Sequence, residues 1–337
     1  MLPSSKPEES GSTITLDIAS ITEASAVAAA HWRGRGDEAA ADNAAIEAAA
    51  EALGRVPASG TIVIGEGEED EADRLFTGEK VGNPKSSLEV DIAVDALEGT
   101  TVCAKALPNA MSVIAVAKRG DLLEVPAIYM NKIAIGPGYD EDVVDLDATP
   151  AENLSRLAEA KGVPIENLTA CVLDRPRHAK LIEEIRATGA ALRLIGDGDI
   201  AGVIHTTATR ATGIDVYMGI GGAHEGVLAA AALACIGGQM QGRLYPANDQ
   251  QRERARAAEI TDIDRKYRLA EMASGDVSFA ATGITSGSFL EGVRFTPRAV
   301  ITHTVVMRSA NQTNRWVRTE RRIGGELPSP RNPGRIG

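Results

Sequence analysis

Short apolar runs alternate with helix-forming segments through the middle of the chain, and this alternation limits the possible folds more than any other feature. Strands that alternate with helices are typical of a mostly parallel sheet covered by helices. We therefore expect an α/β domain in this region. The expected strands are 170–174, 192–195 and 214–219, and the expected helices are 151–160, 176–188, 199–205 and 225–236.

The preceding region has a different pattern, in which two helices are followed by closely spaced apolar runs. Ser20 and Glu23 have the spacing of a capping box at the start of the first helix. Gly120-Asp121 has the composition of a hairpin turn between the last two runs. We therefore expect an antiparallel-rich α+β unit, with helices at 20–33 and 38–53 and strands at 61–64, 90–95, 111–117 and 122–132.

The length of 337 residues fits two domains, and Gly136-Pro137-Gly138 is the expected boundary between them. A charged helix is expected at about 250–273, and strands within 277–310 can pair back with the first domain. The expected segments are a disordered N-terminal tail (1–18), an α+β domain (19–136), an α/β domain (137–323) and a loose Pro/Gly-rich tail (324–337).

The charge balance limits the classes of partner. The chain has 47 acidic and 35 basic residues and a formal net charge of −12, which disfavours nucleic acid and anionic membranes as partners. Its three cysteines, Cys103, Cys171 and Cys235, are widely spaced and form no CxxC pair, which argues against a disulfide framework or a structural zinc site. No secretory signal is visible, so we expect a cytoplasmic protein.

Acidic residues stand at the ends of expected elements. Glu66 follows a short strand, Asp95 and Glu98 lie in the turn that ends another, and Glu225 opens a helix after a Gly-rich turn. Binding sites in layered α/β folds form at the ends of strands, so these carboxylates are candidates for one site. Hard divalent cations prefer oxygen ligands, and two such ions can hold a phosphate and activate a water molecule.

Each of these residues also has a simpler explanation. Asp42 fits an ordinary position on a helix surface, the acid-rich run 66–73 fits a solvated loop, and Glu225 fits a first-turn residue favoured by the helix dipole. His178 and His224 fit surface or capping residues and receive no role. The residues taken one at a time therefore leave the function open.

Several motifs occur in a characteristic order along almost the whole chain. They include Gly34-Arg-Gly-Asp37, Gly60-Thr-Ile-Val-Ile-Gly-Glu-Gly-Glu68, Asp91-Ile-Ala-Val-Asp95, Arg175-Pro-Arg-His178, Gly196-Asp-Gly-Asp199 and Gly219-Ile-Gly-Gly-Ala-His-Glu-Gly226. In this order and spacing, the chain resembles class II fructose-1,6-bisphosphatase, a branch of the lithium-sensitive, metal-dependent sugar phosphatases.

The resemblance implies a layered αβαβα sugar-phosphatase fold with two domains. It implies hydrolysis of the 1-phosphate of fructose 1,6-bisphosphate by metal-activated water, in a homodimer or homotetramer. Two or more Mg²⁺ or Mn²⁺ ions would be held by Asp42, Glu66, Asp95, Glu98 and Glu225. Thr100, Glu66 and Asp95 would be catalytic. The sugar bisphosphate would contact Glu98, Gly99, Thr100, Tyr129, Arg175, Pro176, Arg177, Asp197, Gly198, Asp199 and Gly222.

The chain departs from the family pattern at three positions. Ala96 replaces a usual proline, Glu38 replaces a usual lysine, and His224 replaces another usual proline. Two alternatives therefore stay open. One is a sedoheptulose-1,7-bisphosphatase, or an enzyme that accepts both substrates. The other is a catalytically weak paralogue that binds sugar phosphate.

Overall fold

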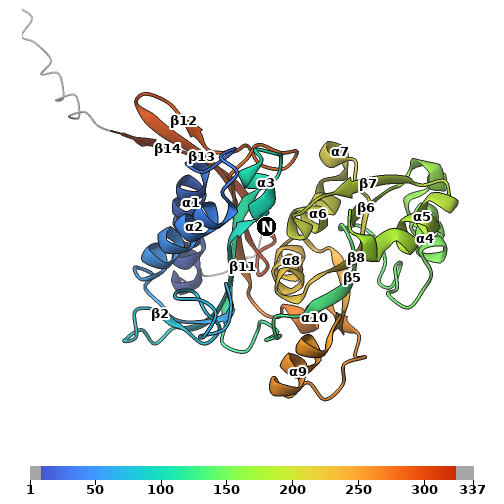
Figure 1. The fold of residues 1–337 in the computed structure, drawn as a ribbon, viewed down its shortest axis with the longest axis horizontal. Coiled ribbons are helices and arrows are strands. Elements are labelled where there is room, and N and C mark those ends of the chain that lie inside the picture. The colour runs from blue at the N-terminus through green and yellow to red at the C-terminus, as the bar shows by residue number, and fades with distance from the viewer. Residues whose placement is uncertain (1–8, 324–337) are drawn as a thin grey trace, which may run out of the picture.

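The computed structural model describes residues 9–323, in which two β-sheets are stacked with helices between and outside them (Figure 1). The first sheet has the order β12-β13-β11-β4-β3-β1-β2, and β14 pairs with the free edge of β13. In this sheet β1 and β3 are parallel, whereas all other neighbouring strands are antiparallel. Its strands are β1 (Ser59–Ile64), β2 (Lys80–Gly82), β3 (Glu89–Glu98), β4 (Met111–Lys118), β11 (Ser278–Gly283), β12 (Arg294–Phe295), β13 (Ala299–Arg308) and β14 (Thr313–Arg322).

The second sheet has the order β10-β9-β5-β8-β6-β7. β6 is parallel to β7 and to β8, whereas β5, β9 and β10 pair in antiparallel fashion. Its strands are β5 (Tyr129–Ile135), β6 (Thr169–Leu173), β7 (Ala191–Ile195), β8 (Val216–Gly222), β9 (Gln239–Tyr245) and β10 (Tyr267–Arg268).

The helices make the layers around the sheets. α1 (Glu9–Ala30) and α2 (Glu38–Leu53) cover the outer face of the first sheet, α6 (Asp199–His205) and α8 (Ala223–Ile236) lie between the sheets, and α4 (Pro150–Lys161) and α5 (Ala179–Ala187) cover the outer face of the second (Figure 1). The result is the expected αβαβα arrangement of an α/β protein. The remaining helices are α3 (Thr100–Ala104), α7 (Thr209–Thr212), α9 (Asp249–Ala257) and α10 (Leu269–Met272), with single 3-10 turns at Ile165–Asn167, Pro176–His178 and Thr206–Ala208.

Small side chains fill the central layer. Ala230 and Ala231 of α8 are completely buried, together with Leu228 and Leu233. Because alanine has a short side chain, a helix rich in it can lie close to both neighbouring sheets, so a core with few aromatic residues still closes. No helix described in this structure combines the length and apolarity needed to cross a bilayer.

The expected hairpin at Gly120-Asp121 is wrong, because β4 and β5 belong to different sheets. Between them the chain makes only an isolated bridge, from Leu122 to Ala273, and Pro126 has no N–H for a strand ladder. The chain therefore crosses between the sheets after Lys118 and before Tyr129, ahead of the expected boundary at residue 136. β11 and β13, from late in the chain, join the first sheet.

Three further expectations differ from the structure. α1 begins at Glu9, within the stretch expected as a tail, whereas residues 1–8 and 324–337 lie outside the described residues. The second sheet is mixed rather than mostly parallel, since β5 inserts in antiparallel fashion between β8 and β9. The charged helix expected at about 250–273 ends at Ala257, shortly before Glu259 adopts a φ of 57°.

Candidate active site

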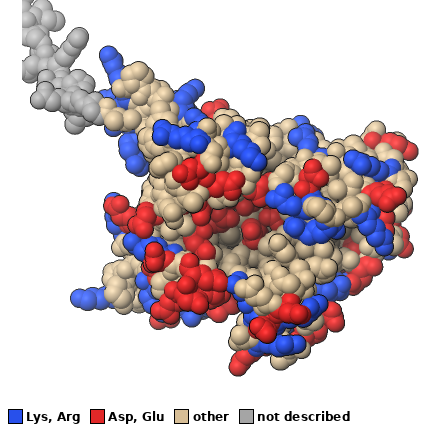
Figure 2. Space-filling model, viewed as in Figure 1, with Lys and Arg blue, Asp and Glu red and all other residues tan. Residues whose placement is uncertain are grey.

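Six acidic residues from distant parts of the chain line one cavity of about 270 Å³, and five of them are the predicted metal ligands: Asp42, Glu66, Asp95, Glu98 and Glu225. They come from α2, the end of β1, the end of β3 and the first turn of α8. In Figure 2, acidic side chains gather in the depression between the two halves of the molecule. Gly99, Thr100, Asp197 and His224 complete much of the lining. The structure therefore brings all of the predicted metal-binding carboxylates together.

The parallel pairing of β1 and β3 puts Glu66 beside the β3 turn, because the carboxyl ends of parallel strands meet at one edge. The N–H of Ala96 donates to Glu66 Oε1 at 2.8 Å and joins the two strand ends. The register with β4 shifts between Asp95 and Glu98, and this irregularity turns the chain into the cavity.

Glu98 connects this turn to the second half of the molecule. Its side chain is buried, and Oε1 accepts a hydrogen bond from the N–H of Ile200 in α6 at 2.8 Å. Gly99 follows with a φ of 85°, a left-handed conformation that favours glycine, and α3 begins at Thr100. The turn therefore holds two carboxylates and a threonine hydroxyl at one end of the cavity.

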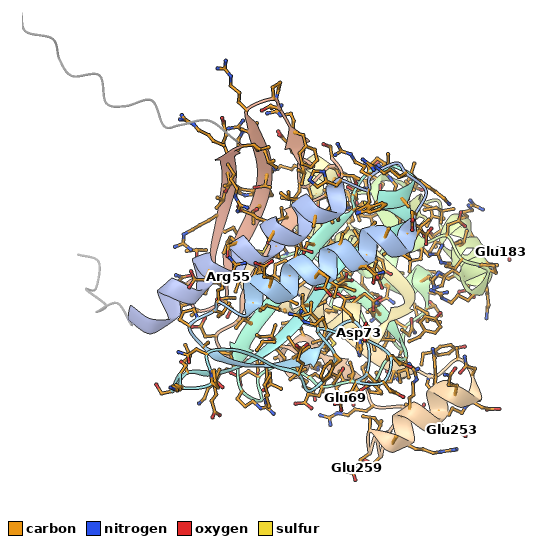
Figure 3. The ribbon with its side chains drawn as sticks, turned by 60° about the vertical axis from the view of Figure 1, so that its left-hand side comes forward. Arg55, Glu69, Asp73, Glu183, Glu253 and Glu259 are labelled. Carbon is orange, nitrogen blue, oxygen red and sulfur yellow. The ribbon has the colours of Figure 1, made fainter. Side chains whose placement is uncertain are left out.

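The acid-rich segment after β1 divides into two parts. Glu66 is half-buried and faces the cavity, whereas Glu69 and Asp73 lie exposed on the loop that follows (Figure 3). The solvated-loop explanation therefore holds for the later residues of the segment and not for Glu66.

The predicted substrate-binding residues fall into two groups. Glu98, Gly99, Thr100 and Asp197 line the acidic cavity. The others are not part of that lining: Tyr129, Arg175, Pro176, Arg177, Gly198, Asp199 and Gly222. Tyr129 begins β5, residues 175–177 follow β6, Gly198 and Asp199 lie at the start of α6, and Gly222 ends β8. The structure thus joins the first group in one cavity, whereas Arg177 lines a separate cavity of about 300 Å³ with Lys132 and His178.

The two arginines already have partners in the protein. Arg177 donates from Nε and from one terminal nitrogen to the carbonyl of Ile220, at 2.9 and 2.8 Å, and its guanidinium lies 4.8 Å from the Tyr129 ring centroid. The Nη2 atom of Arg175 lies 3.7 Å from Oδ1 of Asp197, in an ion pair. An arginine has five N–H donors, so Arg177 keeps others for a ligand.

Comparison with known proteins identifies the family. The family model described as bacterial fructose-1,6-bisphosphatase, glpX-encoded, matches residues 12–321. The chain belongs to this family. The resemblance inferred from the motifs is therefore confirmed.

Curated relatives match over nearly the whole chain. A relative from Synechococcus sp. (strain JA-3-3Ab) is 41% identical over 337 residues, covering 93% of this chain and 96% of that protein. A relative from Trichodesmium erythraeum (strain IMS101) is 40% identical over 335 residues, covering 92% of this chain and 96% of that protein. Both are named D-fructose 1,6-bisphosphatase class 2/sedoheptulose 1,7-bisphosphatase.

In this member of the fructose-1,6-bisphosphatase family, the clustered carboxylates have raised pKa values. Burial is the largest cause in each case. The pKa of Glu66 rises to about 7, because burial and the charges of Asp42 and Glu225 outweigh the hydrogen bond from Ala96. Burial and then the charge of Glu98 raise the pKa of Asp95 well above its ordinary value. Ionising the whole cluster therefore requires added positive charge.

The donor set fits divalent cations. Carboxylate oxygens are the ligands that Mg²⁺ and Mn²⁺ prefer, and such ions would neutralise the cluster. No three His, Cys, Asp or Glu side chains among the described residues are already arranged to hold one ion. Mg²⁺ in proteins is commonly bound by one or two carboxylates together with water and substrate phosphate. The carboxylates present therefore fit ions that are shared with a bound phosphate.

Lys132 is a residue of this site that the sequence pattern did not identify. Its ammonium donates to the carboxylate of Asp199 and, at 2.9 Å, to the carbonyl of Gly222, and its charge partly offsets the increase that burial causes in the pKa of Glu225. The sequence contains one signal, a lysine at an inward position of an apolar strand. A charge at such a position requires a buried partner.

The three departures from the family pattern lie close to the site. Ala96 provides the N–H bonded to Glu66, a hydrogen bond that proline could not donate. His224 lines the acidic cavity, and its Nε2 donates to the carbonyl of Val125 at 3.0 Å. Glu38 is exposed at the start of α2, and its charge adds a small increase to the pKa of Asp197, which burial raises most.

Proposed function

We propose that this protein hydrolyses the 1-phosphate of fructose 1,6-bisphosphate to give fructose 6-phosphate and phosphate. The observation that carries the proposal is the single cavity lined by Asp42, Glu66, Asp95, Glu98 and Glu225 in a member of this phosphatase family. An acidic cavity repels a phosphate unless cations lie between them, so the reaction requires divalent metal.

The carboxylates are the proposed ligands of Mg²⁺ or Mn²⁺. Bound there, such ions would lower the pKa of a water molecule, hold the reacting phosphate and neutralise the leaving oxygen. Glu66 and Asp95 contribute to catalysis from the ends of neighbouring parallel strands. The hydrogen bond from the N–H of Ala96 fixes Glu66 before the substrate arrives, and phosphoryl transfer depends mainly on such positioning and on charge neutralisation.

Thr100 is the proposed group that orients the attacking water. It lines the cavity at the first residue of α3, directly after Glu98 and Gly99. Its hydroxyl can accept a hydrogen bond from water and donate one to a phosphate oxygen. Glu98, Gly99 and Thr100 therefore form one side of the proposed phosphate site.

The remaining predicted contacts are proposed to hold the sugar and its second phosphate. Arginine binds phosphate in a bidentate manner, which suits Arg175 and Arg177 to the distal phosphate. Asp197 and Asp199 can accept hydrogen bonds from sugar hydroxyls. The other proposed contacts are Tyr129, Pro176, Gly198 and Gly222.

A second candidate substrate is sedoheptulose 1,7-bisphosphate, which differs in chain length and uses the same chemistry. The names of both relatives include this activity, and this observation favours an enzyme that accepts both substrates. A catalytically weak paralogue is the remaining alternative, motivated by Glu38, Ala96 and His224. Retention of all five carboxylates favours an active enzyme.

A phosphate-release assay tests these proposals. The purified protein is given fructose 1,6-bisphosphate, sedoheptulose 1,7-bisphosphate or inositol 1-phosphate, with Mg²⁺, Mn²⁺ or EDTA. Release from the bisphosphates only with metal is expected, and the ratio of kcat/KM values chooses between the two sugars. Tight sugar-phosphate binding without turnover would favour the paralogue. A homodimer or homotetramer and a cytoplasmic location stay predictions, and sedimentation tests the former.

A further inference from the structure

His178 is a buried histidine whose two ring nitrogens both have backbone partners. Nδ1 lies 2.7 Å from the carbonyl oxygen of Leu173, and Nε2 lies 2.8 Å from the backbone nitrogen of Ile220. A carbonyl oxygen only accepts and an amide N–H only donates, so Nδ1 carries the proton and Nε2 is the acceptor. One neutral tautomer therefore connects the end of β6 to β8.

These contacts replace a missing strand. β8 pairs with β6 only at Val216 and Tyr217, so the later residues of β8 have no strand on that side. At Ile220, His178 accepts from the N–H, and Arg177 donates two hydrogen bonds to the carbonyl. Consecutive residues of one 3-10 turn thus satisfy both backbone groups of a single residue in β8.

The neighbouring glycine leaves room for this ring. Gly219 has a φ of 143°, and a Cβ added there would lie 3.0 Å from His178 Nε2. The ring and the bare backbone therefore occupy adjoining space, and the contact depends on both. The motifs that contain His178 and Gly219 are far apart in sequence, and this contact explains why one has a histidine and the other a glycine at these positions.

The segment held in this way leads directly into the proposed site. Gly222 lies two residues after Ile220, and α8 then begins and carries Glu225 into the acidic cavity. We propose that His178 is a positioning residue for substrate binding. By accepting from the N–H of Ile220 it fixes the last residues of β8, and the carbonyl of the same residue then orients Arg177. This inference rests on the proposed function, because it assigns the segment to substrate binding.

Two isosteric substitutions separate the two hydrogen bonds. In His178→Gln, the side-chain oxygen can reach the position of Nε2 and accept from Ile220. In His178→Asn, the shorter amide can replace only the Nδ1 donor toward Leu173. His178→Leu removes both. His303 provides a matched control, because its Nδ1 accepts from the N–H of Glu291 in a distant part of the first sheet.

The variants are compared in the full-length protein by KM and kcat for fructose 1,6-bisphosphate with saturating Mn²⁺, after circular dichroism confirms that each is folded. His178→Asn and His178→Leu should raise KM about tenfold with a smaller change in kcat, as expected for the loss of one buried hydrogen bond. His178→Gln should recover most of the affinity, and His303→Leu should leave KM unchanged. Equal KM values for the Gln and Asn variants would overturn the proposal, as would a wild-type KM in the Leu variant.

Hydrogen exchange separates this inference from the proposed function. Without any substrate, the Ile220 amide should exchange faster in the Asn and Leu variants than in the wild type or the Gln variant. An unchanged exchange rate of the Ile220 amide in His178→Leu would show that His178 does not hold β8. A wild-type protein that releases no phosphate from either bisphosphate would overturn the proposed function, while the exchange pattern would still decide whether His178 holds β8.

Discussion

Lys132 and Asp199 form an ion pair between the two sheets, and their side chains are only 1% and 6% exposed. Lys132 also donates to the carbonyl of Gly222, so one ammonium joins β5, the start of α6 and the end of β8. A Cβ at Gly221 would lie 2.0 Å from Asp199 Oδ2 and 3.0 Å from Lys132 Nζ. The pair therefore fits only beneath a backbone without a side chain.

Lys132→Met should destabilise the protein strongly, because it leaves the Asp199 carboxylate buried without its cation. Removing one partner of a buried pair costs about 3–5 kcal/mol. The double variant Lys132→Met/Asp199→Asn should recover much of this loss, since no buried charge remains. Denaturant unfolding measures both variants. A double variant no more stable than Lys132→Met would contradict the pairing.

Ala96→Pro would install the residue usual in the family and remove the N–H that donates to Glu66 Oε1. This hydrogen bond lowers the pKa of Glu66 against the larger effect of burial. Its loss should raise the Glu66 pKa, so the variant should need a higher pH for the same Mn²⁺ affinity. Calorimetric titration of Mn²⁺ across pH tests this, with Ala96→Gly, which keeps the N–H, as the control. Coincident pH profiles for the two variants would refute it.

The stability of the metal-free protein should fall as pH rises. The pKa of Glu66 is about 7 in the folded protein against 4.5 ordinarily. Between these values the folded state binds the proton that the unfolded state has released, so each increase in pH favours unfolding. Thermal unfolding in EDTA should therefore give a Tm that decreases from pH 4.5 toward pH 7.

Added Mn²⁺ should reverse this trend, since the ligands must be deprotonated to bind the ion. The gain in Tm on adding Mn²⁺ should be larger above pH 7 than below pH 4.5, and Glu66→Gln should reduce the decline seen in EDTA. A Tm in EDTA that rises over the same range would show that the cluster is not the source of the pH dependence.

The parts of the structure that followed from sequence are those with local signals. α2 runs from Glu38 to Leu53 as expected, because Asp37 caps its first turn and Gly54 follows its last residue. Glu66, Asp95, Glu98 and Glu225 are predicted because each stands at the end of a short apolar strand or at a helix start, whereas Asp42 lies within α2 and is predicted only by the family resemblance. Their meeting in one cavity required only the rule for strand ends and the family resemblance.

The parts that sequence did not predict depend on distant partners. β14 (Thr313–Arg322) is mostly exposed, with polar residues on both faces, and its backbone pairing with β13 defines it as a strand. The sheet to which β5 belongs is decided by β8 and β9, far along the chain. Lys132 becomes interpretable only when Asp199 is seen beside it.

Thr100→Ala should reduce turnover more than substrate affinity. The hydroxyl is proposed to orient water in the transition state, and misplacement of a reacting group costs about a hundredfold in kcat. KM for fructose 1,6-bisphosphate should change little, because the arginines and the metal ions are the groups proposed to hold the substrate. Steady-state kinetics measure both, and Thr100→Ser, which keeps the hydroxyl, is the control. A change confined to KM would make Thr100 a binding group.

Asp95→Asn and Glu98→Gln should abolish turnover while the fold is retained. Each substitution removes a proposed charged oxygen ligand without changing the size of the side chain, and metal ligation contributes several kcal/mol to such reactions, so kcat should fall about a hundredfold or more. The metal-free Asp95→Asn protein should also have a higher Tm at neutral pH, because burial and then the charges of Glu98 and Glu66 raise the pKa of Asp95 and so oppose its ionisation. Glu69→Gln is the matched control, since Glu69 is an exposed carboxylate on the neighbouring loop (Figure 3). Phosphate release and thermal unfolding are measured on all three. Near-normal rates in both site variants would refute the metal assignment, and a lower metal-free Tm for Asp95→Asn would show that repulsion within the cavity does not limit stability.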